Sequence, residues 1–432
     1  MAYFKIITLG CKVNQYESVY ISEELIKRAW KPQIKDSHVD LVIINTCIVT
    51  QKASHQSRQE IRKALRENPN AKIVVTGCYS QVYPEELKEI KGVSLIIGNK
   101  YKTKIPELIE STIHRKNYVI TDNFSKKELF QYMPISRFDG KTRAFLKIQD
   151  GCESFCSYCI IPYARGPYRS LNINNVLTAI EHLIDKGYKE IVLTGIHLGK
   201  YGIDNNTSLE SLLNEIGKNK YPVRIRLSSI EPNEISDGLI DMIASEDWIC
   251  KHLHIPLQSG DNRILSRMKR RYTREDFCKL IMKIYNKIPF IGIGVDVMTG
   301  FPGENLTAHQ NTMSLLIDLP ISYLHVFPYS DRPKTSAFYF NNKLSPKIKK
   351  IRAKELREIG HQKRREFLKK CLGKMFWGLV EKDLKNGILK AVTDNYITVI
   401  LQNNMDITGK LVIIKLQKLD QHNMAFGEIY YA

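Results

Sequence analysis

Three cysteines stand close together in the stretch GCESFCSYCIIPYARG, residues 151–166. Cys152, Cys156 and Cys159 offer three thiolates on one loop, with no second pair of cysteines nearby. A structural zinc site closes with four protein ligands, and its cysteines usually come as two pairs. Thiolates are also the usual ligands of iron–sulfur clusters, and a four-iron cluster held by only three of them keeps one iron open for chemistry. The spacing therefore predicts a catalytic iron–sulfur site rather than a zinc site.

A second set of three cysteines is spread over the first 78 residues. Cys11, Cys47 and Cys78 each follow a short apolar run, FKIITLG, DLVIINT and KIVVTG, and helix-like segments separate these runs. This is the pattern of a small parallel sheet covered by helices, whose strands end along one ligand-binding edge. We expect the three thiols to converge and to hold a second cluster. The alternatives are small buried side chains at strand ends, or a cluster that takes three thiols from one set and one from the other.

A second series of strand and helix patterns begins near residue 142. Its strand candidates are AFLKIQDG, EIVLTGIH, RIRLSSIE, HLHIPLQS, IGVDVMTGF and YLHVFPYS. Six such units predict a partial (β/α)6 barrel, with its chemistry at the C-terminal mouth. Taken singly, a polar residue after a strand is more often a turn or cap residue. The residues expected around the mouth are Cys152, Cys156, Cys159, Thr194, Gly195, Ser228, Ser229, Glu231, Gln258, Gly300 and Glu304.

Composition places these elements in a globular chain of 432 residues, of which 43% are hydrophobic and 25% charged. No run approaches the roughly 20 apolar residues that span a bilayer, and the first residues lack a signal-peptide pattern. We therefore expect a cytoplasmic protein without a membrane partner. In a reducing compartment, nine cysteines indicate metal binding or catalysis rather than disulfides. Cys250, Cys278 and Cys371 stand outside both sets and are expected to be unligated.

The charge of the chain indicates a polyanionic partner. It carries 65 Lys and Arg against 45 Asp and Glu, a net charge of +20. Residues 341–432 contain 19 basic and 9 acidic side chains, so this last fifth holds half of the excess. The run KIKKIRAKELREIGHQKRREFLKKCLGK, residues 347–374, reads as a basic helix. A nucleic acid is the expected partner, and a merely solvated basic surface is the alternative.

The cysteine motif, with Tyr158 before its last cysteine and six βα units around it, resembles the radical S-adenosylmethionine superfamily. With TLGCKVNQYES, INTCIVT and VTGCYSQ in front and a small basic β domain behind, the whole chain resembles the methylthiotransferases of that superfamily. The resemblance implies two [4Fe-4S] clusters, one on each set of cysteines. The cluster of the 152 loop would bind S-adenosyl-L-methionine at its open iron and cleave it to a radical. The N-terminal cluster would present the sulfur to be transferred.

The resemblance also implies partners and further cofactor contacts. The expected partners are a tRNA substrate, a reductant protein of flavodoxin or ferredoxin type, and a sulfur donor. Many radical enzymes hold the methionine amine with Gly-Gly-Glu after the second barrel strand, but this chain reads Thr194-Gly195-Ile196-His197 there. The residues expected to bind the cofactor are Tyr158, Thr194, Gly195, Ser228, Glu231 and Gln258.

The branch of the family is indicated by Cys11-Lys12-Val13-Asn14. The isopentenyl-adenosine branch typically reads Gly-Cys-Gln-Met-Asn at this place, and the ribosomal-protein branch Gly-Cys-Pro-Lys-Asn. The chain is similar to the branch that converts N6-threonylcarbamoyladenosine beside the anticodon to its 2-methylthio derivative. Alternatives are an isopentenyl-type adenosine, a ribosomal protein, or a noncatalytic iron–sulfur RNA-binding protein. The basic tail disfavours a protein substrate, and two open irons disfavour a binding role alone.

The predicted architecture is α/β multidomain. It has an N-terminal parallel α/β sheet domain over residues 1–116, a linker over 117–141, a radical S-adenosylmethionine core with a partial (β/α)6 barrel over 142–368, and a small β-barrel over 369–432. The last domain alternates β runs with glycine and asparagine turns and resembles the RNA-binding TRAM domain. Its Phe376, Trp377 and Tyr396 either face RNA or fill the core. Because the six cysteines lie upstream, we expect truncation after Lys370 to weaken RNA binding alone.

Overall fold

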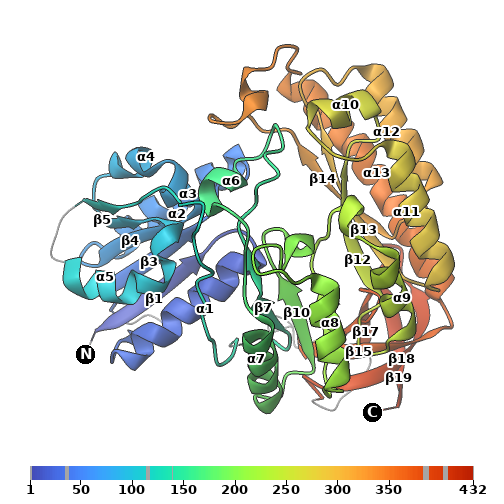
Figure 1. Cartoon of the computed structure of the whole chain (residues 1–432), viewed down its shortest axis with the longest axis horizontal. Helices are drawn as coiled ribbons and strands as arrows, with labels where there is room; N and C mark the ends of the chain where they lie inside the picture. Colours follow the sequence, from blue (N-terminus) through green and yellow to red (C-terminus); the bar gives the residue numbers. More distant parts are fainter. Residues whose placement is uncertain are drawn as a thin grey trace.

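The computed structural model describes residues 2–34, 38–112, 117–138, 140–382, 389–401 and 407–431. Figure 1 shows an N-terminal sheet domain in blue and cyan, a central set of parallel strands from green to orange, and C-terminal strands in red. This is the multidomain α/β architecture that the sequence predicts. None of the helices among the described residues is both long and apolar enough to cross a membrane.

The N-terminal sheet has six parallel strands in the order β2-β1-β3-β4-β5-β6. Every residue of β3 is buried, as expected for a central strand covered on both faces. The last strand lies at the start of the range expected to be a linker and pairs with β5. The strands are β1 (Tyr3–Thr8), β2 (Lys31–Pro32), β3 (Leu41–Thr46), β4 (Lys72–Gly77), β5 (Val93–Ile97) and β6 (Tyr118–Ile120). The helices are α1 (Lys12–Lys27), α2 (Gln51–Glu67), α3 (Cys78–Val82), α4 (Pro84–Lys88), η1 (Asn99–Lys104) and α5 (Ile105–Thr112).

The central domain contains the six predicted parallel strands, in two sheets of order β11-β10-β7 and β12-β13-β14. An isolated parallel bridge between Ile225 and Ile249 links the two sheets into a partial barrel. The strands are β7 (Ala144–Lys147), β10 (Glu190–Thr194), β11 (Arg224–Leu227), β12 (His252–Gln258), β13 (Gly292–Thr299) and β14 (Tyr323–Pro328), with the short antiparallel pair β8 (Gln149–Asp150) and β9 (Arg169–Ser170).

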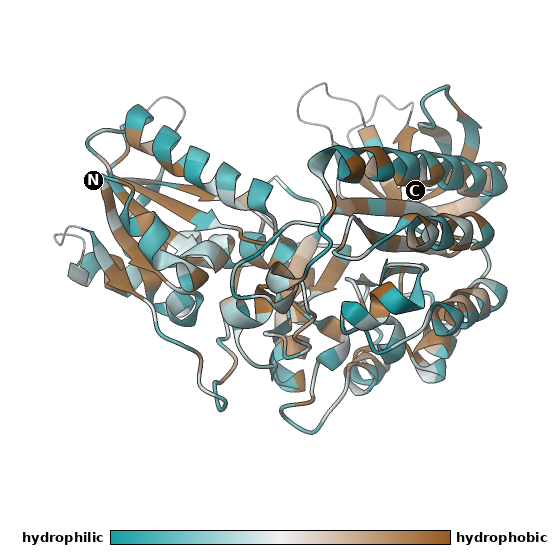
Figure 2. Ribbon diagram, turned by 90° about the horizontal axis from the view of Figure 1, so that it is seen from above, coloured by the Kyte–Doolittle hydropathy of each residue, from teal (hydrophilic) through white to brown (hydrophobic). Residues whose placement is uncertain are grey.

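Helices between these strands cover the outside of the barrel. Helix α11 begins with a capping box of Thr273 and Asp276 and buries Phe277, Ile281 and Ile284, which share one face. Figure 2 shows the same arrangement throughout, with hydrophobic strands under helices whose outer faces are polar. The helices are α6 (Ile161–Arg165), α7 (Ile173–Asp185), η2 (Leu198–Lys200), α8 (Leu209–Lys218), η3 (Pro232–Glu234), α9 (Asp237–Ser245), α10 (Asn262–Arg267), α11 (Arg274–Lys287), α12 (Leu306–Asp318) and η4 (Ser336–Tyr339).

The C-terminal strands form a closed five-stranded barrel in the order β15-β16-β17-β19-β18, as predicted. The long helix α13 (Pro346–Cys371) leads into it, and Phe367, Leu368 and Cys371 at its end belong to the barrel's hydrophobic core. This domain is therefore packed onto the helix that precedes it. The strands are β15 (Met375–Lys382), β16 (Leu389–Thr393), β17 (Thr398–Leu401), β18 (Leu411–Leu419) and β19 (Ala425–Tyr431).

Candidate active site between the two cysteine sets

The N-terminal cysteines meet at one edge of the first sheet. Cys11 caps α1 just beyond β1, Cys47 follows β3, and Cys78 begins α3 directly after β4. These three strands are neighbours, so the three thiols lie together, as the strand pattern predicts. A side-chain carbon added at Gly10 would stand 3.0 Å from Sγ of Cys47, which shows how closely the loop before Cys11 passes. Burial, with the neighbouring Cys78 and Cys11 thiols, raises the pKa of Cys47 to about 11.

The second set of cysteines lies on the loop that follows β8. The loop starts at Gly151, whose φ of +79° and contact with Pro167 leave no room for a side chain. The backbone N–H of Cys159 donates to the carbonyl of Cys156 at 2.9 Å, which turns the loop back on itself. Burial raises the pKa of Cys159 to about 12, and the Cys156 and Cys152 thiols add to that shift. The three thiols of this loop therefore lie close enough to act on one another electrostatically.

Among the described residues, the cysteine sulfurs are not gathered as closely as the ligands of a single metal ion. Two cysteines bound to one zinc stand at most about 4.6 Å apart, since each Zn–S bond is about 2.3 Å. In the part of the chain that the structure describes, no three cysteine sulfurs lie within 4.8 Å of one another. The potential ligands that do lie so close are His254, Asp296 and His325 on β12, β13 and β14, where Asp296 bonds both histidines.

Helix α6 brings the two sets of cysteines together. It follows Cys159 along the chain and packs against α3, so that Ile160 and Ala164 join the hydrophobic core around Cys78. The Nδ2 group of Asn99 donates to the carbonyl of Ala164 at 2.8 Å and lies 3.5 Å from Sγ of Cys78. The loop that carries one set of thiols is thus fixed directly onto the element that carries the other.

A buried ion network fastens this interface. Glu17 on α1 is fully buried and accepts hydrogen bonds from Lys102 at 2.7 Å, from Lys147 at 2.9 Å and from Arg165. Burial alone would raise the pKa of Glu17, but the charges of Arg165, Lys102 and Lys147 hold it well below its usual range. Arg165 also donates to Oδ1 of Asn14 at 2.6 Å, and its charge acts on the Cys11 and Cys78 thiols.

The segment after β14 also contacts the N-terminal domain near its three cysteines. Arg332 donates to Oγ of Ser54 at 3.1 Å, and its charge acts on Cys47. Lys334 donates to the carbonyl of Val82 at 3.0 Å. The segments that follow the first and last strands of the barrel therefore both bind the N-terminal domain. These contacts place the N-terminal thiols beside the barrel mouth.

Two charged groups beside the barrel cysteines were not identified from the sequence. Nδ1 of His197 lies 3.3 Å from Sγ of Cys152, and its Nε2 bonds Glu234 at 2.8 Å. Burial opposes the charge of His197, yet Cys152 and Glu234 raise its pKa to about 9. Arg270 lies 3.5 Å from Sγ of Cys156. His197 occupies the place where many radical enzymes have Gly-Gly-Glu, but no local sequence pattern marks Arg270, or the Glu234 that bonds His197.

The structure places three of the expected cofactor residues at the ends of β10 and β11. Thr194 ends β10 and is buried. A side-chain carbon at Gly195 would stand 2.8 Å from Oε1 of Gln149, so the backbone here approaches another strand end. Ser228 follows β11, and among the described residues its buried Oγ has no hydrogen-bond partner.

Of the other three expected residues, Glu231 and Tyr158 have side-chain partners within the protein, and Gln258 ends a strand. Glu231 forms an ion pair with Arg270, the residue beside Cys156. Gln258 ends β12 with a φ of +65° at a register shift in the strand pair. Tyr158 packs edge-on against Phe301, with ring centroids 6.5 Å apart. Gln258 thus lies at a strand end, and Glu231 and Tyr158 lie in loops that follow β11 and β8. Their contact with a cofactor stays a prediction.

Comparisons with known proteins agree with this geometry. The uncharacterized protein family UPF0004 matches residues 3–98, and the radical SAM superfamily matches residues 146–316. A threonylcarbamoyladenosine tRNA methylthiotransferase MtaB from Aquifex aeolicus is 40% identical over 94% of this chain and 98% of its own length. The chain belongs to the radical S-adenosylmethionine methylthiotransferase family. It falls in the MtaB-like part of that family, since MtaB of Bacillus subtilis is also 37% identical over 95% of the chain and 93% of its own length.

Methylthiotransferases with another named substrate are also similar to this chain. A tRNA-2-methylthio-N(6)-dimethylallyladenosine synthase from Carboxydothermus hydrogenoformans is 32% identical over 96% of both chains. Among solved structures, the radical S-adenosylmethionine methyltransferase TsrM from Kitasatospora setae has a TM-score of 0.61 at 16% identity, covering 78% of this chain and 75% of its own. That likeness concerns the fold alone.

Proposed function

We propose that this methylthiotransferase replaces the C2 hydrogen of N6-threonylcarbamoyladenosine, beside the anticodon of tRNA, with a methylthio group. The observation that carries the proposal is the meeting of two three-cysteine sets at one domain interface, joined through α6. The substrate is taken from the MtaB relatives and from the similarity of Cys11-Lys12-Val13-Asn14 to that branch.

A second cluster on Cys11, Cys47 and Cys78 is supported by polar atoms around them that lack partners. Within the described residues, Oγ of Ser80, Oδ1 of Asn99 and Nε of both Arg165 and Arg332 are buried without a hydrogen bond. Such atoms are rare in folded proteins and point to a group that is bound in the working enzyme. The two guanidinium groups also place positive charge beside the thiols, which suits an anionic iron–sulfur cluster. We assign one [4Fe-4S] cluster to each cysteine set.

S-adenosyl-L-methionine fits the barrel mouth by the same test, because the buried Oγ of Ser228 lacks a partner among the described residues. Side-chain bases at ordinary pKa values do not usefully deprotonate an adenine C2–H. The bound cofactor supplies one-electron chemistry able to break that bond, and a methyl group. The chain's own residues position the reactants. His197 and Arg270 stand beside the thiols, and Thr194, Gly195, Ser228, Glu231, Gln258 and Tyr158 are proposed to line the cofactor's place.

The tRNA is proposed to lie against β14, α13 and the C-terminal TRAM-like barrel. A groove of about 760 Å³ is formed there. Arg364 in this groove has no hydrogen-bond or ion-pair partner among the described residues. Basic and aromatic side chains together suit RNA phosphates and unstacked bases. The basic and aromatic residues of the groove are Tyr323, His325, Phe327, Arg357, His361, Arg364 and Tyr396.

The remaining partners stay predictions. A reductant protein of flavodoxin or ferredoxin type and a sulfur donor are implied by the chemistry, since the reaction consumes electrons and sulfur. A cytoplasmic location follows the sequence pattern alone.

Nucleoside mass spectrometry of tRNA from cells with and without the gene tests the proposal. We expect the 2-methylthio derivative of N6-threonylcarbamoyladenosine to disappear on deletion, and the unmethylthiolated nucleoside to accumulate. Genes encoding Cys47→Ala or Cys156→Ala should not restore it, whereas Cys278→Ala should. Loss of a methylthiolated isopentenyl adenosine instead would show that the substrate is wrong. Stoichiometric zinc in anaerobically prepared protein, in place of about eight irons for two four-iron clusters, would show that the cofactors are wrong.

A further inference from the structure

Lys12 reaches from the N-terminal domain to the barrel. It follows Cys11 directly and is the first residue of α1. Its ammonium lies 6.0 Å from the centroid of the Phe145 ring on β7, the first barrel strand. The backbone of Lys12 is thus next to a proposed cluster ligand, while its ammonium group lies beside the barrel.

The surroundings of this ammonium are mostly cationic. The positive charges of Arg143 and Arg226 act on it, and Glu190 is the nearby carboxylate. Arg226 lies on the polar face of β11, two residues from Arg224, whereas the alternate residues of this strand face the hydrophobic core. Among the residues that the structure describes, no hydrogen bond or ion pair involves the side chain of Lys12.

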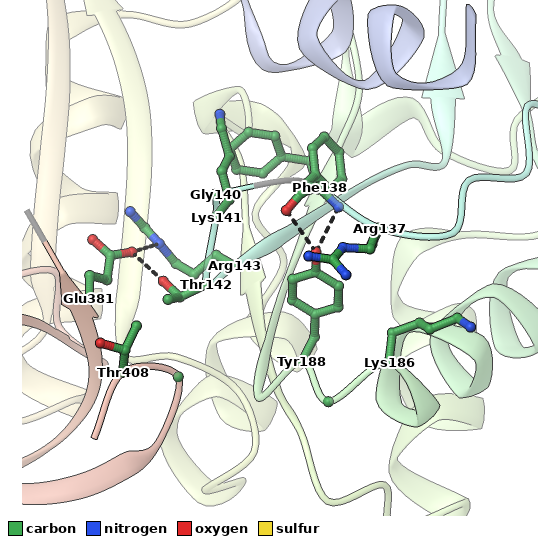
Figure 3. A pocket seen from close by; sticks show the side chains of 13 residues that line it. Arg137, Phe138, Gly140, Lys141, Thr142, Arg143, Lys186, Tyr188, Glu381 and Thr408 are labelled. Atoms are coloured by element: carbon green, nitrogen blue, oxygen red, sulfur yellow. Dashed lines mark hydrogen bonds and ion pairs between the residues drawn. The ribbon is translucent and has the colours of Figure 1, made fainter. Parts of the chain in front are cut away.

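The neighbouring cations already have anionic partners. Arg226 donates to Glu190 at 2.7 Å. Arg143 donates to Glu381 at 2.8 Å, as Figure 3 shows across a pocket of about 670 Å³. Both nearby carboxylates are therefore engaged. A partly buried ammonium costs free energy unless an anion pairs with it.

We propose that Lys12 binds the carboxylate of the threonylcarbamoyl group on the substrate adenosine and thereby selects that nucleoside. The inference rests on the function proposed above. A threonylcarbamoyl group carries one carboxylate, and a dimethylallyl group carries none. The charge-assisted bond therefore forms with the first nucleoside, whereas the second would leave the ammonium unpaired.

The chemistry of the base places this carboxylate within reach. The reacting C2 must approach the sulfur held at the Cys11 set, and the N6 substituent lies on the same edge of adenine, with N1 between the two positions. A residue next to a cluster ligand is therefore well placed to contact that substituent. The long side chain of Lys12 and its direction toward Phe145 meet this requirement.

Binding of anticodon stem-loop RNAs to the anaerobic holoenzyme tests the proposal. One RNA carries N6-threonylcarbamoyladenosine and the other carries its methyl ester, which removes the charge and changes little else. We expect the wild-type protein to prefer the acid about 10- to 100-fold, as for hydrogen bonds to charged groups. Lys12→Gln should bind both RNAs equally, and Lys12→Arg should keep part of the preference.

Lys141→Gln is the matched control. Lys141 lies 4.7 Å from the same Phe145 ring, but its ammonium is bonded to Gln15. We expect this variant to keep the full preference for the acid. Iron content and the visible spectrum of Lys12→Gln should equal those of the wild type, which shows that the cluster beside Cys11 is intact.

Two outcomes would overturn the proposal. One is a wild-type protein that binds acid and ester equally, which needs no variant. The other is a Lys12→Gln protein that keeps the wild-type preference. Both differ from a failure of the proposed function. In that case the wild type would methylthiolate the dimethylallyl RNA and leave the threonylcarbamoyl RNA unchanged, whatever stands at position 12.

Discussion

Two buried carboxylates hold the two domain interfaces of this molecule, and they do so in different ways. Glu17, at the interface of the N-terminal domain and the barrel, binds side chains from both, Lys102 on one side and Lys147 and Arg165 on the other. Glu190, at the interface of the barrel and the C-terminal domain, binds arginines of its own domain, Arg224 and Arg226 closely and Arg143 at 3.8 Å.

The arginines held by Glu190 use their remaining donors across the second interface. Arg224 donates to the carbonyls of Trp377 and Val392 at 2.8 and 2.6 Å. Arg226 donates to the carbonyls of Thr393 and Asp394, both at 2.9 Å. Glu17 thus joins its interface through side chains of both domains. The arginines bound to Glu190 instead contact the backbone of the C-terminal barrel. The C-terminal barrel is docked as part of the scaffold that carries the active site.

Truncation after Lys370 gives the largest expected effect. It removes the carbonyl partners of Arg224 and Arg226 and exposes Phe367 and Leu368, which lie in the core of the missing barrel. We expect poor solubility or a strongly lowered Tm, together with loss of iron, rather than the isolated loss of RNA binding that the position of the cysteines suggests. Calorimetry and iron analysis check this. A truncated protein with wild-type Tm and iron content would contradict this account and show that the C-terminal domain can be removed without destabilising the rest.

Glu17→Gln should have the next largest effect, because it leaves Lys102, Lys147 and Arg165 buried without their shared carboxylate. Removing one partner of a buried ion pair typically costs about 3–5 kcal/mol. Urea unfolding of the apoprotein measures the loss. Glu24→Gln, on the same helix, breaks a surface pair with Lys27 and should cost at most about 1 kcal/mol. Equal losses in the two variants would contradict the importance of the Glu17 network.

Acid should weaken the second interface through Glu190. Burial alone would raise the pKa of Glu190, but Arg226 and Arg224 hold it at about 2. Since this pKa is below that of the unfolded chain, the stabilisation is complete above about pH 5 and is lost as the pH falls toward 2. The difference in Tm between wild type and Glu190→Gln should therefore be largest at pH 7 and shrink by pH 3. Glu215→Gln, which breaks a surface pair with Lys218, is the control. A difference that stays constant with pH would contradict this account.

The comparison also shows what the sequence could reveal. The six barrel strands, the five-stranded barrel and the meeting of Cys11, Cys47 and Cys78 follow from local periodicity, because strand ends in parallel sheets share an edge. Strand β6 was not predicted, since three residues at a sheet edge carry no periodic signal.

Contacts between distant residues could not be predicted in the same way. Arg165 meets Glu17 across 148 positions, and His197 meets Glu234 across 37. Such pairs form only when the tertiary structure has formed, so no regular spacing in the sequence indicates them. Arg226 is held by backbone carbonyls, which every residue type has. No sequence pattern therefore marks that docking surface.

The smallest expected effect concerns the groove between β14 and α13, which is proposed to bind RNA. Arg364 lines this groove, whereas its neighbour Arg365 is exposed outside it. If Arg364 contacts a phosphate, Arg364→Gln should lower tRNA affinity at low salt and reduce the slope of log affinity against log salt by about 1, because one fewer counterion is released. Arg365→Gln should leave the slope close to that of the wild type. Affinity measured between about 50 and 200 mM salt checks this. A slope changed by Arg365→Gln and not by Arg364→Gln would place the phosphate path on the outer face of α13, away from the aromatic side chains of β14.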